Sequence, residues 1–96
     1  MDSIIETYRE YQTIIRGYTP KVVLGTWREL KKLAKYLEDR SLNFESATLA
    51  DLENYCIERT EGKSLGYRNL IISQVRSFYT YLEQQEYCMD NPSSHL

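Results

Sequence analysis

The sequence is poor in the residues on which most catalytic and metal sites depend. Its 96 residues contain a single histidine, His95, and two cysteines, Cys56 and Cys88, that stand far apart in the chain. So few ligands argue against a histidine acid–base site, a zinc site with the usual ligand spacing and a disulfide scaffold. We therefore expect no metal and no cofactor, and we interpret Cys56 as a small buried apolar residue.

Long apolar runs are also missing. No stretch approaches the ~20 residues that a membrane-spanning helix needs, and the first residues lack the basic-then-apolar layout of a signal peptide. The composition, 42% hydrophobic and 27% charged, is that of an average globular chain. The expectation is one small folded domain that resides in the cytoplasm and has no membrane partner.

Helix breakers are scarce, with four glycines and two prolines, and the breaker-free stretches have helical rather than alternating periodicity. Four helices are predicted, at about residues 3–16, 20–40, 48–60 and 64–85. Each boundary has a local signal: Gly17 after the first helix, Thr19-Pro20 before the second, a capping box from Thr48 to Asp51, and Ser64 before the fourth. The predicted fold class is all-α, with four helices around one core.

Three of these helices carry an apolar stripe that predicts the buried side. The first stripe is Ile4, Tyr8, Tyr11 and Ile15. The second is Val23, Trp27, Leu30, Ala34 and Leu37. The last is Ile71, Val75, Phe78, Tyr79 and Leu82. Phe44 is the one apolar anchor expected in the loop 41–47.

The net charge of −2 argues at first sight against a nucleic-acid partner. The charges are unevenly distributed, however. Residues 19–40 carry six basic and three acidic side chains, residues 60–82 carry three basic and one acidic, and the other segments hold three basic and ten acidic. Helices 20–40 and 64–85 are therefore the basic pair.

On a helical wheel, the basic residues of helix 20–40 gather opposite its apolar stripe. They are Lys21, Arg28, Lys31, Lys32 and Lys35. A surface helix without a partner usually mixes charges of both signs, so this row is typical of phosphate contact. The alternative is a lysine-rich face that only keeps the chain soluble.

The exposed side of helix 64–85 consists mostly of short hydrogen-bonding residues. They are Asn69, Ser73, Arg76, Ser77 and Thr80. Asparagine and arginine side chains read adenine and guanine edges, and short side chains allow a backbone to approach a groove closely. The pattern also fits an idle face on which serine and threonine tolerate exposure.

Two stretches of the sequence carry a family resemblance. The first comprises YTPKV at residues 18–22, REL at 28–30 and YLE at 36–38. The second is LIISQVRSFYTYL at residues 70–82, followed by DNPSSHL at 90–96. In this order, they resemble the beginning, the last helix and the exit of the N-terminal core-binding domain of tyrosine recombinases, the family of phage integrases and Xer-like enzymes.

The resemblance implies a compact SAM-like orthogonal bundle that grips core-site duplex DNA through its second and fourth helices for integration or recombination. Residues 1–90 would form this domain, and residues 91–96 would begin a linker to a catalytic domain that this chain lacks. That catalytic domain and further recombinase protomers on DNA would be its protein partners. The family cleaves DNA with a tyrosine in the catalytic domain, beside an HxxR element that is absent here, so we expect no catalysis by this chain.

Charge, helical wheels and resemblance together define the predicted DNA-binding residues. Asn69, Ser73 and Arg76 are expected nearest the bases, and Lys63 and Arg68 toward the DNA backbone. The full set is Lys21, Arg28, Lys31, Lys32, Lys35, Lys63, Arg68, Asn69, Ser73 and Arg76. A helical protein-interaction module with a basic docking face is the alternative, since fold alone does not decide between them.

Overall fold

The computed structural model describes all 96 residues and contains four helices and no strand. They are α1 (Asp2–Ile14), α2 (Pro20–Glu38), α3 (Leu49–Thr60) and α4 (Leu65–Gln84). No end differs by more than two residues from the range expected from the sequence. The all-α fold class is confirmed. No helix is both long and apolar enough to cross a membrane.

Side-chain caps fix where three of the helices begin. The Thr19 hydroxyl accepts a hydrogen bond from the Val22 amide, with Pro20 in the first turn, where its missing N–H costs nothing. Before α3, Thr48 and Asp51 exchange side-chain and backbone hydrogen bonds in a complete capping box. Ser64 caps α4 in the same way as Thr19 caps α2. These boundaries are therefore encoded locally.

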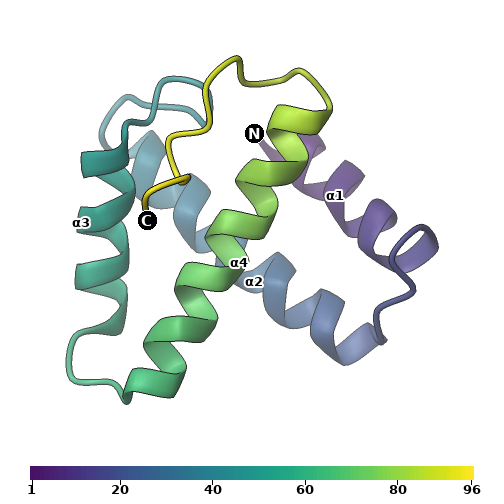
Figure 1. Ribbon diagram of the computed structural model, residues 1–96, viewed down its shortest axis with the longest axis horizontal. Coiled ribbons are helices and arrows are strands. Elements are labelled where there is room, and N and C mark those ends of the chain that lie inside the picture. The colour runs from purple at the N-terminus through teal and green to yellow at the C-terminus, as the bar shows by residue number, and fades with distance from the viewer.

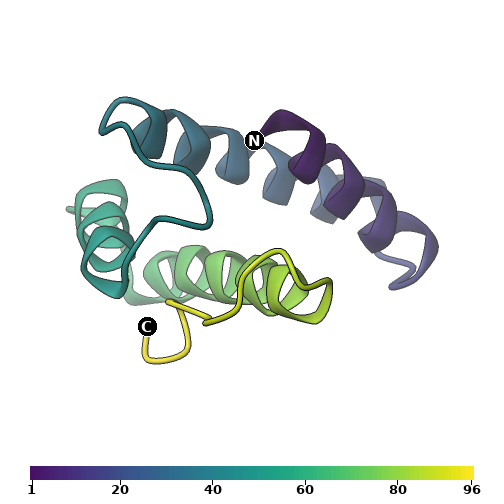
Figure 2. The same ribbon diagram turned by 90° about the horizontal axis from the view of Figure 1, so that it is seen from above.

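The helices form two hairpins, α1 with α2 and α3 with α4, which cross each other. Figure 1 shows α4 in front of α2. In Figure 2, α1 and α2 lie along one side of the molecule and α4 along the other. The first turns of α2 and α4 both lie in the lower part of Figure 1, far from the N-terminus.

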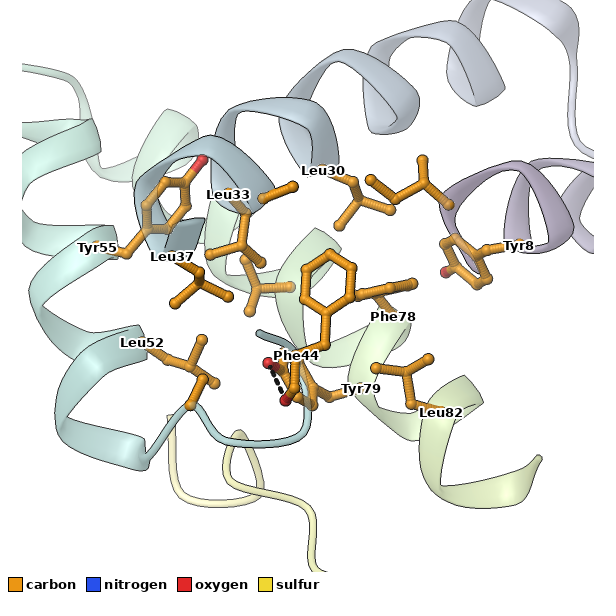
Figure 3. Packing of buried hydrophobic residues seen from close by; sticks show 14 of the residues in the cluster. Tyr8, Leu30, Leu33, Leu37, Phe44, Leu52, Tyr55, Phe78, Tyr79 and Leu82 are labelled. Carbon is orange, nitrogen blue, oxygen red and sulfur yellow. Dashed lines mark hydrogen bonds between the residues drawn. The ribbon is translucent and has the colours of Figure 1, made fainter. Parts of the chain in front are cut away.

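The core fills the space between the two hairpins (Figure 3). Phe44 reaches it from the loop between α2 and α3, and its ring packs edge-on against that of Phe78. The buried Tyr79 hydroxyl donates a hydrogen bond to the Phe44 carbonyl at 2.8 Å. Every residue of the predicted α4 stripe is buried, as is Cys56.

The predicted stripe of α1 is partly wrong. Ile15 is 70% exposed, and the residues that α1 buries are Ile5, Tyr8 and Gln12. Ile15 lies beyond the last turn of α1, so the helix does not hold it against the core. In α2, Trp27 is only half-buried, because its indole lies toward α1, where Nε1 donates to Glu6 Oε1 at 2.7 Å.

After α4 the chain turns back over the α3–α4 hairpin, on the side away from α1 and α2 (Figures 1 and 2). Cys88 and Ser93 are buried, and Leu96 packs against the core. Asn91 Oδ1 accepts hydrogen bonds from both the amide and the hydroxyl of Ser93. That residues 91–96 begin an interdomain linker stays a prediction.

Candidate nucleic-acid interface

Seven of the twelve cationic side chains have no carboxylate within salt-bridge distance, and all seven are exposed. They all lie in residues 16–32 and 63–76, which we call the cationic segments. The seven are Arg16, Lys21, Arg28, Lys32, Lys63, Arg68 and Arg76. The unpaired cations are thus confined to the α1–α2 turn, the first two-thirds of α2, the α3–α4 turn and the first twelve residues of α4.

The cationic segments are nearly free of negative charge. They hold eight cationic residues and one carboxylate, whereas the rest of the chain holds four cationic residues and thirteen carboxylates. In Figure 1 the first turns of α2 and α4 lie at opposite lower corners of the molecule, and the two helices cross between them. A surface with this excess of one sign creates a potential that attracts a polyanion.

The single carboxylate of the cationic segments, Glu29, does not reach that surface. It is 4% exposed and pairs with Arg59 of α3, whose Nη2 and Nε donate to its two oxygens at 2.9 and 3.1 Å. The Tyr55 hydroxyl also donates to Glu29, and Arg59 donates to the Tyr67 hydroxyl at 2.7 Å. The network joins α2, α3 and the first turn of α4.

Burial and the network shift the ionisation of its members. Desolvation lowers the pKa of Arg59, but the Glu29 carboxylate and the Tyr67 hydroxyl outweigh it, so this pKa is raised. Burial, followed by the hydrogen bond to Glu29, raises the pKa of Tyr55. Arg59 stays charged and Tyr55 neutral at physiological pH, so Arg59 neutralises Glu29 internally.

Sequence reasoning missed this network and counted Glu29 only as one of the three acidic residues of 19–40. One signal was available in the sequence, because Glu29 lies directly before Leu30 and four residues before Leu33, both of which are apolar. A carboxylate between such neighbours on a helix lies at the edge of the buried side. The identity of its partner, thirty residues away, has no local signal.

The structure divides the predicted basic row of α2. Lys31 Nζ lies 3.1 Å from Asp2 of α1 and 5.6 Å from the centre of the Trp27 ring. Lys35 Nζ lies 3.8 Å from Asp39. Lys21, Arg28 and Lys32 remain unpaired, although Lys32 and Lys35 share a hollow with two carboxylates, those of Asp39 and Glu58. The row therefore has three free cations, and the paired Lys31 interrupts them.

The predicted base-reading residues of α4 stay together. Asn69, Ser73 and Arg76 line one wall of an open cleft, which we call the α4 cleft. Ser77 and Thr80 extend this wall toward the end of the helix. Lys63 and Arg68 lie outside the cleft, exposed and without carboxylate partners. The polar face of α4 is thus one side of a concave site.

The opposite wall, which the sequence did not reveal, comes from the turn between α1 and α2. Arg16 and Tyr18 line the cleft there, and the largely buried Tyr8 and Tyr81 close its bottom. Gly17, between the two wall residues, adopts φ +66°, a left-handed conformation that closes α1. The cleft has a volume of about 590 Å³, and none of its twelve lining residues is acidic.

A model of the family described as "Phage integrase, N-terminal SAM-like domain" matches residues 5–86. The matched region contains most of α1 and the whole of α2, α3 and α4. This family describes an N-terminal, non-catalytic domain, which agrees with the resemblance found in the sequence.

Proposed function

Since the chain belongs to the N-terminal SAM-like domains of phage integrases, we propose that it grips core-site duplex DNA through α2 and α4 during integration or recombination. Family membership suggests DNA binding, and the grip by these two helices is our inference. One observation carries it, namely that every unpaired cation lies in the cationic segments while thirteen of fourteen carboxylates lie elsewhere.

In the proposed complex, phosphate contacts position the domain and α4 reads the sequence. Lys21, Arg28 and Lys32 of α2 neutralise phosphates along one strand and release their counterions. Lys63 and Arg68 do the same where α4 begins. Asn69, Ser73 and Arg76 then lie beside the major groove, where asparagine and arginine hydrogen-bond adenine and guanine edges. Only this last group would contribute to specificity by direct contact with the bases.

Two further partners belong to the proposal. A catalytic domain of the same polypeptide would hold the opposite side of the duplex, and other recombinase protomers would occupy neighbouring sites. Two domains that embrace one duplex bind more tightly than either alone, because the second binding event becomes intramolecular. We therefore expect the isolated domain to bind DNA weakly.

A salt titration with charge variants tests the proposal. The wild type, Lys32→Glu, Arg76→Ala and the control Arg9→Glu are titrated with a labelled duplex, and fluorescence anisotropy gives the affinity at several salt concentrations. With five to seven phosphate contacts, the slope of log affinity against log salt is about −5 for the wild type. Lys32→Glu should make this slope shallower, and Arg76→Ala should weaken binding.

Arg9→Glu is the matched control because Arg9 is an exposed cation of α1 that pairs with Glu6 outside the cationic segments. It should weaken binding less than either test variant. Equal binding by all four proteins, or no binding by the wild type at low salt, contradicts the proposed function.

A protein partner is the second candidate, and exposed apolar side chains favour it. Ile14, Ile15, Val22 and Leu24 are exposed around the α1–α2 turn, and Ile14 and Ile15 are each 70% exposed. A cluster of this kind is typical of an interaction surface. If this were the main binding surface, Ile14→Ser with Ile15→Ser would abolish partner binding, whereas the charge variants would not.

A further inference from the structure

The α4 cleft differs from a typical pocket for a small apolar ligand. Such pockets are lined mostly by hydrophobic and aromatic side chains with a few polar groups. Here seven of the twelve lining residues are polar or charged, and both charged residues, Arg16 and Arg76, are arginines. In a chain with net charge −2, a concave site with two guanidinium groups and no carboxylate points to an anionic ligand.

Arg16 is held in position before any ligand binds. Its Nη2 donates a hydrogen bond to the Tyr18 hydroxyl at 3.0 Å, and its guanidinium carbon lies 5.5 Å from the centre of the Tyr18 ring. The backbone supports this arrangement, since the amides of Arg16 and Tyr18 donate to the carbonyls of Tyr11 and Gln12, respectively. A guanidinium that is already ordered loses less conformational entropy when it binds.

Arg76 faces the same cleft from α4 and has no carboxylate partner. The two arginines therefore approach one concave space from elements that are far apart in the sequence. Short donors border the space beside Arg76, namely the Ser73 and Ser77 hydroxyls and the Asn69 amide. Guanidinium forks and hydroxyl groups are the donors that commonly contact DNA phosphates.

We propose that the α4 cleft is a subsite for one backbone phosphate of the bound duplex, held between Arg16 and Arg76, and that Arg16 is a DNA-contacting residue. The inference rests on the proposed function, adds the α1–α2 turn to the DNA-binding surface, and assigns Arg76 to a phosphate instead of a base edge. Arg16 and Tyr18 fix the register of α4 on the duplex, because the phosphate that they hold lies next to the bases that α4 faces.

The test uses the 96-residue chain, a labelled duplex and the variants Arg16→Ala, Arg76→Ala and the double variant. Arg9→Ala is the control, since it removes the same charge from an exposed position of α1 outside the cleft. Arg16→Ala should make the slope of log affinity against log salt shallower by about 0.9, the value of one phosphate contact. Arg9→Ala should leave the slope unchanged.

The double variant tests whether the two arginines share one phosphate. A shared phosphate predicts a slope change in the double variant close to that of either single variant, whereas separate contacts predict the sum of the two. Tyr18→Phe keeps the ring and removes the hydroxyl that holds Arg16, so it should weaken binding less than Arg16→Ala. All four substituted residues are exposed, and thermal unfolding checks that each variant is folded.

The outcomes separate the two proposals. If the wild type binds DNA and Arg16→Ala behaves like Arg9→Ala, the cleft proposal fails while the proposed function stands. A fully additive double variant also overturns the shared phosphate. The same titration with polyglutamate, an acidic polypeptide, tests the other kind of anion. If Arg16→Ala loses binding to polyglutamate but not to DNA, the cleft takes an acidic protein segment instead. No DNA binding by the wild type removes both proposals.

Discussion

The cationic segments and the remainder of the chain follow opposite electrostatic patterns within one small fold. In residues 16–32 and 63–76, seven exposed cations have no carboxylate partner, and the single carboxylate is buried in an ion pair. In the remainder, each of the four cations lies within 4 Å of a carboxylate, and most of the thirteen carboxylates are free. A net charge of −2 therefore conceals two segments with an excess of positive charge and a remainder with an excess of negative charge.

This difference shows why net charge is a poor guide to a polyanion partner. In the proposed complex, the acidic remainder would repel DNA and so restrict the orientation in which a duplex approaches. The burial of Glu29 has a related effect, since an exposed carboxylate at this position would stand among the free cations of α2. The fold thus keeps a charge that it needs for packing away from the surface where that charge would oppose binding.

The largest expected effect comes from breaking the buried ion pair. Glu29→Gln leaves the Arg59 guanidinium, whose side chain is only 20% exposed, without a counter-charge. The free energy of unfolding should fall by about 3 kcal/mol, because an unpaired buried charge is costly. Urea denaturation followed by circular dichroism measures this change.

Glu38→Gln is the matched control for Glu29→Gln, since Glu38 is an exposed carboxylate at the end of α2 without a salt-bridge partner. It should change the stability by less than about 0.5 kcal/mol. Equal effects of the two substitutions would show that the Glu29 network does not stabilise the crossing of the hairpins.

A smaller effect should separate paired from unpaired lysines of the same helix. Lys31 contacts Asp2, whereas the neighbouring Lys32 has no carboxylate within 4 Å. Lys32→Ala should make the salt slope of DNA binding shallower by about 0.9, and Lys31→Ala should change it by less, because Lys31 is already partly neutralised. Equal slopes for the two variants would mean that pairing with carboxylates does not decide which cations meet DNA.

Much of the fold could be predicted from the sequence because its signals are local. Thr19, Thr48, Ser64 and Gly17 mark helix boundaries through contacts within a few residues. The stripe of α4 was correct throughout, since that helix lies against the core along most of its length. The predicted stripe of α1 was wrong at Ile15, because the apolar spacing in the sequence continues one residue beyond the end of the helix.

The site was harder to predict, because helical wheels assign a face but not what lies opposite. The wheel placed Asn69, Ser73 and Arg76 on one face of α4, and the structure makes that face the wall of a cleft. Arg16 had no signal, since it lies just after a helix whose charged residues are mostly acidic. The pairing of Lys31 with Asp2 likewise depends on how α1 packs against α2.

The most direct test of the central claim is to map the DNA contacts by NMR. The backbone amide resonances of the ¹⁵N-labelled domain are followed while a duplex is added at low salt. The account predicts that the largest shift changes lie in residues 16–32 and 63–76, with little change in α3 and in residues 85–96. Shift changes centred on α3 or on the C-terminal segment, or no change at all, would contradict it.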